Sequence, residues 1–386
     1  MDRSGFSLAG SNSNPAWGMV LLTIPDAARS LPYNRGMSHL DILLPFGLPR
    51  AEMADDVLRM LNAPALASLV TRTSAHRREE LDTFSRALPH ETWLARQFGL
   101  EQGMRKRGSP PVAAAAARAY GLEADAGSWF LLHPMHLQLT RNHGLLTDQR
   151  QLDLPEDESH SLFDAAKPLF DEIGKLLLYG DARTWFVRAD DWDELNTATA
   201  DAALGQNVAL CLPQGPAERD WRKLHNEIQM LWHAHPVNEE RQRRGEKPVN
   251  SAWLWGGAAA TADTPSTRHS ELFNLPGWTH ALGRSSPAPV KQSTASDIIA
   301  AAPRHGLTIL DQLVEPALAD NWGEWISRLN TLESTWFAPI YEALKSGKIN
   351  QVSLVVTHGA DLAEFISGKY SVKKFWVKPS LSRLAR

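Results

Sequence analysis

The chain has 386 residues, of which 43% are hydrophobic and 22% charged, with a net charge of −4 at neutral pH. This length can hold one large domain or two with ample cores, and the composition is that of a globular protein. The mild acidity argues against a general nucleic-acid binder, which usually carries a basic face. Fourteen Trp against five Tyr indicate many buried anchors or an aromatic-lined pocket.

The single cysteine, Cys211, excludes an intrachain disulfide framework and is typical of a reducing compartment. It lies in an apolar run, which favours a buried, inert thiol over a nucleophile. No run approaches the roughly 18 apolar residues that a membrane span requires. We therefore expect a cytoplasmic protein with neither a nucleic-acid nor a membrane partner.

The first 36 residues differ from the rest, being rich in Ser, Asn, Gly and Pro. Their one apolar run lacks the basic start and the cleavage site of a signal peptide. A convincing strand, 40–46, follows shortly after Met37. We expect residues 1–36 to be a loose extension and residues 37–386 to be a single large α/β domain.

The remaining elements are expected in alternation along the chain. Short apolar runs predict strands at 128–139 (bent at Pro134), 183–187, 208–212, 307–310, 351–357 and 373–377. Helical spacing or composition predicts helices at 51–61, 113–120, 155–178, 220–235, 322–344 and 360–366, with two or more between 63 and 98. Alternating strands and helices indicate an α/β sandwich with a largely parallel central sheet flanked by helices.

The stretch 220–257 has the highest density of Trp, His and Asn. Its helix has one mostly apolar stripe and is expected to stop at Pro236. A charged connection, 239–247, is expected to be exposed. Residues 250–257 are predicted to form a buried strand. The pair of glycines at its end predicts a tight loop there.

Ligand sites of α/β proteins are usually assembled at the ends of such elements. The polar and aromatic side chains here could bind a small polar or phosphorylated metabolite, because Asn and His supply the donors that such a ligand needs. The predicted ligand-binding residues are His225, His235, Asn238, Asn250, Trp253 and Trp255. Structural packing is the alternative, because apolar helix stripes and paired tryptophans usually form core.

Familiar catalytic and cofactor motifs are missing from the sequence. There is no P-loop, G-x-G-x-x-G, G-x-S-x-G or H-E-x-x-H, so no cofactor and no catalytic residue is predicted. The acidic run 190–194 could bind a hard cation, although the solvated start of a helix explains it as well. His133 and His136 would lie on opposite faces of a strand. No metal site is predicted.

Several segments together resemble the RpfE-type regulatory proteins of bacteria. They are Ser128–Leu139, Asn226–Met230, His235–Asn238, Asn250–Gly257 and Phe375-Trp376, and the resemblance extends from about Met37 to Trp376. It implies a regulatory association rather than a particular reaction.

A second resemblance is narrower. Asn250-x-x-Trp253-Leu-Trp-Gly256, and the tail from Leu332 to Gly359, are similar to segments of archaeal-type cofactor-independent phosphoglycerate mutases. This similarity implies an alkaline-phosphatase-like fold. That family's last strand ends in Asp-His-Gly, whose Asp and His bind metal, whereas this chain has Thr357 before His358 and Gly359.

Further ligands of that family are missing upstream. The family has an Asp followed four residues later by a His, whereas Asp311 and Asp320 are followed at that spacing by Glu315 and Glu324. The Asp-Gly of the first strand is also missing, since Ile42 follows Asp41. Two-metal phosphoryl transfer needs such ligands to hold two cations about 3.5–4 Å apart. The resemblance thus implies the scaffold without its metal chemistry.

Three functions remain open at this point. The favoured one is a regulatory protein on a phosphoglycerate-mutase-like scaffold, without metal-dependent catalysis, that acts by binding a ligand or a protein partner. The second is an enzyme, mutase-like or phosphatase-like, that uses a divergent site. The third is an interaction scaffold, which requires exposed aromatic residues such as Trp322, Trp325 and Trp336.

Overall fold

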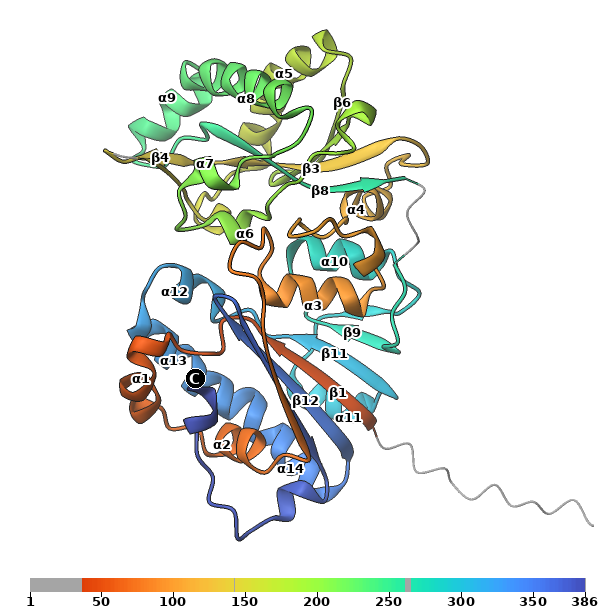
Figure 1. The fold of residues 1–386 in the computed structure, drawn as a ribbon, viewed down its shortest axis with the longest axis vertical. Coiled ribbons are helices and arrows are strands. Elements are labelled where there is room, and N and C mark those ends of the chain that lie inside the picture. The colour runs from red at the N-terminus through yellow and green to blue at the C-terminus, as the bar shows by residue number, and fades with distance from the viewer. Residues whose placement is uncertain (1–36, 142, 261–264, 386) are drawn as a thin grey trace, which may run out of the picture. The chain divides into compact units, whose positions relative to one another are not determined.

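The computed structural model describes residues 37–141, 143–260 and 265–385, and the predicted N-terminal extension lies outside them. A seven-stranded sheet and a four-stranded sheet organise this part of the chain, with a small two-stranded hairpin beside them (Figure 1). Residues 35–386 form one compact unit.

The seven-stranded sheet is built around β1 (Met37–Leu44). Two parallel neighbours flank β1, namely β11 (His305–Ile309) and β12 (Ile349–His358). Beyond β11 the sheet continues in parallel with β9 (Glu271–Phe273) and β10 (Val290–Lys291). Beyond β12 it ends in two antiparallel strands, β13 (Asp361–Gly368) and β2 (Ala75–Glu80). The predicted α/β class with a largely parallel central sheet is therefore confirmed.

Alternation along β1 assigns its two faces. Leu40, Ile42 and Leu44 enter one apolar core, whereas Leu43 enters another, as the two-residue period of a strand requires. The first core is closed by helices on one side of the sheet: α1 (Ala54–Met60), α2 (Pro64–Thr71), α11 (Ala295–Ala301), α12 (Val314–Leu318), α13 (Trp322–Leu332) and α14 (Ala338–Ser346).

The three tryptophans of the interaction-scaffold hypothesis lie in this first core. Trp322, Trp325 and Trp336 are all buried, and the Trp325 indole donates to the backbone oxygen of Phe46 at 2.9 Å. They are packing residues and do not form an exposed aromatic surface, so this argument for an interaction scaffold is lost.

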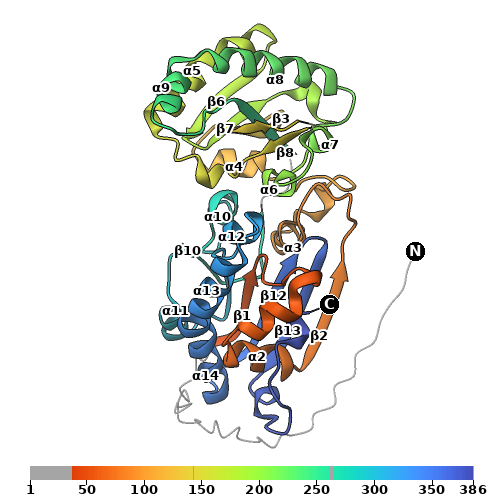
Figure 2. The same cartoon turned by 90° about the vertical axis from the view of Figure 1, so that its left-hand side faces the viewer.

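The four-stranded sheet is antiparallel, in the order β6 (Leu176–Asp181), β7 (Thr184–Arg188), β3 (Ser128–Met135) and β8 (Ser251–Ala259). One face packs against α5 (Glu156–Glu172) and α8 (Glu218–His233), and the short α9 (Pro236–Arg243) follows α8 (Figure 2). The hairpin of β4 (Leu137–Leu139) and β5 (Gly144–Leu146) follows β3. This second sheet was not anticipated from the sequence.

The other face of the four-stranded sheet shares a core with the seven-stranded sheet. Trp253 and Trp255 of β8 lie in the same apolar cluster as Leu43, Leu307 and Val355. Helices on this side are α3 (Pro89–Gln97), α4 (Ala113–Ala119) and α10 (Gly277–Arg284). The tryptophan-rich strand predicted at 250–257 is thus a buried strand, as expected.

Several predicted elements are wrong. Residues 208–211 form a helix, α7 (Val208–Cys211), because Asn207 caps its first turn by accepting from the Ala209 amide at 3.1 Å. The predicted helix 360–366 is strand β13, which turns back from β12 at Gly359 and pairs along its length. The predicted strand 373–377 is a short 3-10 turn followed by irregular chain. Strand β2 lies within the region predicted to be helical.

The charged connection predicted at 239–247 is not simply exposed. Pro236 ends α8 but also occupies the first turn of α9, where its missing N–H costs nothing. Arg241 of α9 has no solvent exposure and donates to Glu158 of α5 at 2.6 Å. A charged residue in this segment therefore ties two helices together.

The glycine pair at 256–257 does not end its strand. Gly256 has φ of +74° and lies beside a register shift between β3 and β8, so the chain makes a bulge and pairing resumes to Ala259. A Cβ at Gly257 would lie 2.6 Å from the Phe130 ring. The pair therefore allows a bulge and a close approach of strands, and the expected tight loop is wrong.

The long predicted helix at 322–344 is one continuous run with a π-helical segment, Glu333–Phe337, between α13 and α14. Pro339 falls in the first turn of α14 and does not break the run. Within the π segment, the buried Glu333 carboxylate accepts from the amides of Ala65 and Leu66 at 2.7 and 3.0 Å. Its charge caps the start of α2 from a distant part of the chain. No helix in the described ranges has the length and apolar character to cross a membrane.

Candidate functional site

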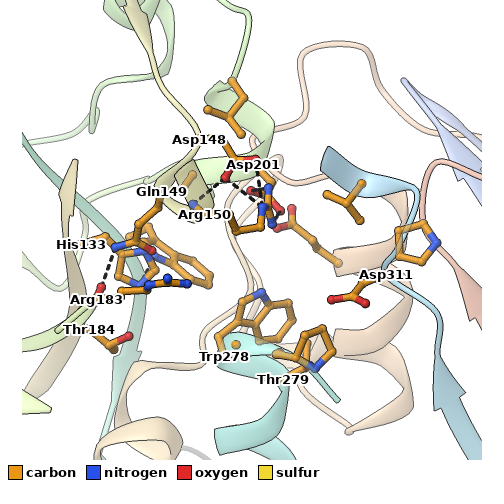
Figure 3. A pocket seen from close by; sticks show the side chains of 18 of the residues that line it. His133, Asp148, Gln149, Arg150, Arg183, Thr184, Asp201, Trp278, Thr279 and Asp311 are labelled. Carbon is orange, nitrogen blue, oxygen red and sulfur yellow. Dashed lines mark hydrogen bonds and ion pairs between the residues drawn. The ribbon is translucent and has the colours of Figure 1, made fainter. Parts of the chain in front are cut away.

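A cavity of about 540 Å³ opens at the carboxyl ends of the parallel strands (Figure 3). Pro45 follows β1, and Ile309 and Asp311 lie at and just beyond the end of β11. The four-stranded sheet and its connections supply the opposite wall, including His133 and Arg183. Open α/β sheets place ligand sites at this edge, and the volume is that of a small-molecule site.

Arg150 lies at the centre of one wall (Figure 3). Its guanidinium donates to Asp148 at 2.9 Å and to Asp201 at 2.8 and 3.1 Å. Burial acts to lower the pKa of Arg150, but the charges of Asp201 and Asp148 outweigh it and hold that pKa above its ordinary value. This triad is a fixed feature of the wall with one net negative charge, in which each group already has a partner.

Glu91 and His90, in the first turn of α3, also line the cavity, and both side chains are buried. The Glu91 carboxyl accepts from the Leu88 amide and from the Thr199 hydroxyl, both at 2.7 Å. Burial, reinforced by the nearby Asp201, raises the pKa of Glu91 to about 8. Burial lowers the pKa of His90 to about 4. At neutral pH both side chains therefore favour their uncharged forms.

Aromatic rings form an adjoining surface of the cavity. The Trp255 indole N–H donates to His133 Nε2 at 3.4 Å, and the two rings meet edge to face. Trp278 packs against Trp255 with ring centroids 5.8 Å apart. Burial lowers the pKa of His133 to about 4, so its imidazole is neutral near pH 7. The wall thus offers polarisable rings and a neutral imidazole.

Acidic groups outnumber basic ones around the cavity. Its lining contains two arginines, Arg150 and Arg183, and six carboxyl side chains: Glu91, Asp148, Glu156, Asp181, Asp201 and Asp311. Two of these acids accept from tyrosine hydroxyls, Asp181 from Tyr120 and Glu156 from Tyr179. Arg183 is exposed, and no carboxylate of the described chain lies within ion-pair distance of its guanidinium. The cavity therefore has a net negative character.

At the end of β12, where the family resemblance implies a metal-binding Asp, this chain has a neutral side chain. Thr357 is buried, and its hydroxyl accepts from the Phe46 amide at 3.3 Å. The ring of His358 packs against Phe46 and Trp322 and is not part of the cavity lining. Among the residues that the structure describes, one set of three ligating side chains has donor atoms close enough to share an ion, and it lies elsewhere, at His39, Asp41 and His305.

The structure uses most of the sequence-predicted binding residues internally. His225 is buried on α8, where its Nε2 lies 2.8 Å from the Ser251 hydroxyl and its ring stacks on Trp221. The Asn238 amide is buried and binds both backbone groups of Val249, at 2.7 Å each. These hydrogen bonds hold α8 and α9 to the start of β8.

The other four residues have four different surroundings. Asn250 pairs with both backbone groups of Leu137, and His235 caps α9 by accepting from the Val237 amide at 3.3 Å. The Trp253 indole donates to the Ala198 carbonyl at 2.8 Å. Trp255 is the one residue of the six that lines the cavity. A smaller surface hollow is lined by Asn238 and Asn250 together with His136 and His233. Their predicted roles in binding a ligand therefore remain predictions.

Sequence reasoning missed the charged residues of the cavity. Arg150 lies in a short 3-10 turn, Asp201 in the short helix α6 (Ala200–Ala203) and Asp311 in the loop after β11, and no local motif links them. Glu91 gave a weak signal, because a Glu soon after Pro89 matches the start of a helix. Its burial and its contact with Thr199 depend on the tertiary fold.

Comparisons with known proteins were made for the sequence and for the fold. No family model matches the chain. Over 124 residues the chain is 28% identical to the 2,3-bisphosphoglycerate-independent phosphoglycerate mutase 2 of Methanothermobacter thermautotrophicus. The match covers 32% of this chain and 30% of that protein, so it spans about a third of either.

Two solved structures are similar over most of the chain. The PH0037 protein from Pyrococcus horikoshii superposes with a TM-score of 0.52 at 12% identity, covering 86% of this chain and 88% of that one. The cofactor-independent phosphoglycerate mutase from Thermoplasma acidophilum gives a TM-score of 0.46 at 14% identity, covering 90% and 94%. This chain is thus distantly similar to the cofactor-independent phosphoglycerate mutases and has the alkaline-phosphatase-like fold that the sequence predicted.

Proposed function

We propose that the chain is a regulatory, ligand-binding protein on a phosphoglycerate-mutase-like scaffold, without two-metal phosphoryl transfer. The observation that carries the proposal is Thr357. Where the resemblance implies a metal-binding carboxylate, a buried hydroxyl accepts from the Phe46 amide and supplies no negative charge. A pair of divalent cations needs several anionic ligands at this edge, because their mutual repulsion must be offset.

The cavity favours a small polar ligand that is neutral or positively charged. Even with Glu91 protonated, five carboxylates face two guanidinium groups across its walls. Unit charges about 4 Å apart interact by roughly 4 kcal/mol at the effective dielectric of a partly buried site. A phosphate dianion would therefore be repelled unless Arg183 engaged it, whereas a cation would also gain from the faces of Trp255 and Trp278.

Calorimetric titration and thermal shift on the purified chain test this proposal. The ligands are 3-phosphoglycerate, a neutral sugar, and the diamine putrescine, each with and without added Mn²⁺. We expect binding of the neutral or cationic probe, no mutase turnover, and weaker diamine binding by Asp311→Asn. Asp164→Asn, an exposed acid on α5 away from the cavity, is the matched control.

Three results would contradict the proposed function. Interconversion of 3- and 2-phosphoglycerate with Mn²⁺ would overturn the proposal, as would tight binding of 3-phosphoglycerate that Arg183→Met abolishes. The latter result would point instead to a phosphorylated metabolite as the ligand. A chain that binds none of the three probes, in a folded state with an intact thermal transition, would also count against a metabolite site.

A divergent enzyme is the second candidate, and Glu91 favours it. A buried carboxyl with a pKa near 8 beside a cavity has the properties of a general acid–base group. Its hydrogen bonds to Leu88 and Thr199 also explain it as a helix cap. If turnover of any polar substrate is found, Glu91→Gln should abolish that turnover while ligand binding persists.

A further inference from the structure

A second cluster of functional side chains lies on the central strand, four residues before the cavity. His39 and Asp41 are two apart on β1, so both side chains project from the same face. His305 is the register partner of His39 on β11. His269 reaches the same point from the connection that leads into β9. Three imidazoles therefore surround one carboxylate.

The distances are short for every pair. His39 Nε2 lies 2.7 Å from Asp41 Oδ1, while His269 and His305 direct Nε2 to Oδ2 at 2.8 and 3.1 Å. The side chains of Asp41 and His269 are essentially inaccessible to solvent, whereas those of His39 and His305 retain 23% and 17% exposure. The cluster thus has a closed floor and a partly open side in the described structure.

One contact within the cluster is not a hydrogen bond. Asp41 Oδ1 is buried and has no hydrogen-bond partner among the described residues, although His39 Nε2 lies close to it. His39 Nε2 is instead paired with the Ser353 hydroxyl at 2.9 Å. The nearest group to this oxygen is therefore the ring nitrogen of His39, at ion-pair distance. Two electron-pair donors placed side by side are typical of the ligands of a shared cation.

A second contact orients one of the imidazoles. His269 Nδ1 lies 2.7 Å from the Thr267 hydroxyl, which leaves Nε2 directed at the cluster. Carboxylates that bind metals are usually held in turn by hydrogen-bonded neighbours of this kind. The arrangement therefore includes an outer residue that fixes the ring and its tautomer.

We propose that His39, Asp41 and His305 form a binding site for one divalent transition-metal ion of the zinc class, with His269 holding the Asp41 carboxylate in place. Two imidazole nitrogens and one carboxylate oxygen suit zinc, cobalt or nickel, whereas magnesium and calcium prefer an all-oxygen shell. With ligand bonds of about 2.0–2.1 Å, tetrahedral ligand atoms are roughly 3.3 Å apart. The three donor atoms lie within 4.8 Å of one another, so modest side-chain shifts would bring them to that spacing.

This site is separate from the cavity and from the two-metal chemistry that the family resemblance implies. His39 and Asp41 lie within the first five residues of β1, whereas the cavity begins at Pro45, after the strand has ended. The two imidazoles, His39 and His305, are side chains that the resemblance does not assign. The proposal does not depend on the function proposed for the cavity, and either can fail without the other.

Arg268 gives the proposal its sharpest test. Its exposed guanidinium lies 3.1 Å from Asp41 Oδ2, where it would compete with a metal ion for the same carboxylate. Arg268→Met removes that competing charge without removing a ligand. Zinc should therefore bind several-fold more tightly to Arg268→Met than to the unchanged chain. A purely structural histidine cluster predicts no such gain.

The experiment uses the full chain, stripped with a chelator and then titrated with Zn²⁺ and with Co²⁺. We expect one ion per chain by elemental analysis, visible Co²⁺ absorption bands, and a thermal midpoint that rises with Zn²⁺ but not with Mg²⁺. His305→Gln should weaken binding by about a hundredfold or more. His280→Gln, an exposed histidine of α10, is the matched control and should bind as the unchanged chain does.

Asp41→Asn removes the anionic ligand and should abolish the cobalt bands. If that variant fails to fold, His305→Gln and Arg268→Met still decide the question, because both residues are partly exposed and Asp41 keeps other partners. A folded, unchanged chain that retains no zinc would overturn the proposal. So would stoichiometric binding that His305→Gln leaves unaffected.

Discussion

Arg241 Nη1 lies 2.6 Å from Glu158 Oε2, and the arginine side chain has no exposure to solvent. The same guanidinium donates to the carbonyl of Lys247 at 2.9 Å and to that of Leu152. One side chain from α9 therefore holds three parts of the chain together: α5, the segment before α5 and the segment after α9. The composition of segment 239–247 predicts a solvent-exposed run of charges, but a buried arginine within the segment anchors it.

Replacing this cation tests its contribution. Arg241→Met should lower the free energy of unfolding by about 1–3 kcal/mol, because it leaves two buried carbonyls without their donor and the Glu158 carboxylate with Arg244 as its remaining partner. Chemical denaturation measures the loss. Arg243→Met, an exposed neighbour on the same helix, should change stability by less than about 0.5 kcal/mol. Equal losses of stability in Arg241→Met and Arg243→Met would contradict the stabilising role of Arg241.

Glu91 should make the fold less stable as pH rises. Its pKa is about 8 in the folded chain against an ordinary 4.5, so the folded state binds more protons than the unfolded state between these values. The free energy of unfolding then falls as pH increases from about 4.5 to 8. Glu91→Gln should remove this dependence and stabilise the fold by a few kcal/mol at pH 8.5. If the free energy of unfolding depended on pH equally in the unchanged chain and in Glu91→Gln, the raised pKa of Glu91 would be refuted.

His225 should make the fold less stable as pH falls below about 6.5, which is the opposite pH dependence to that of Glu91. Burial lowers its pKa to about 4 from 6.5, so below pH 6.5 the unfolded state takes up the proton first. Stability conferred by the neutral imidazole is present above pH 6.5 and is lost as pH falls toward 4. His225→Gln should flatten this part of the stability profile by about one proton. Ligand binding in the cavity should be unchanged, and a loss of binding would support the sequence-based prediction instead.

The bulge in β8 depends on a glycine. Gly256→Ala should cost about 1–2 kcal/mol, because φ of +74° is unfavourable for an L-residue, and its Cβ would also lie 3.2 Å from Val112. Thermal and chemical denaturation measure the cost. Gly368→Ala, where the nearest atom would be 3.7 Å away, is the control and should be close to neutral. The bulge would not need glycine if Gly256→Ala proved equally neutral.

The remote cap of α2 can be tested at Glu333. Glu333→Ala leaves the amides of Ala65 and Leu66 without an acceptor and should destabilise the fold by about 2–4 kcal/mol. Glu333→Gln retains one acceptor oxygen and should recover about half of that loss. Exchange of the amide hydrogens at residues 65 and 66 should accelerate more in the Ala variant. Unchanged exchange rates would show that the cap contributes little.

The fold class could be predicted because the parallel strands are buried on both faces. Strands β1 and β12 have apolar residues at successive positions, and this is visible without a structure. The strand β13 was misread because Ala360, Leu362 and Glu364 are good helix formers. Pairing with β12 across the turn at Gly359 overrides that local preference. The 208–212 run was misread because apolar composition alone does not separate a buried strand from a capped helical turn.

The site was less predictable than the fold for a physical reason. Arg150 and Asp201 are an ion pair whose members are 51 residues apart, and neither belongs to a periodic pattern. Their pairing follows from how the connections meet, which local sequence does not encode. The neutral side chain at Thr357, by contrast, can be read directly from the sequence, because the resemblance implies a carboxylate at that position. The His39–Asp41–His305 cluster was missed because its members come together only through strand register.

That register has a consequence for folding itself. If β1 slid by one residue against β11 and β12, every side chain would exchange faces. Asp41 and His39 would be moved into the apolar core now occupied by Leu40, Ile42 and Leu44. Such a misaligned sheet would have to bury an anion among hydrocarbon side chains, so Asp41 discourages wrong alignments of the central strand before any ligand is encountered.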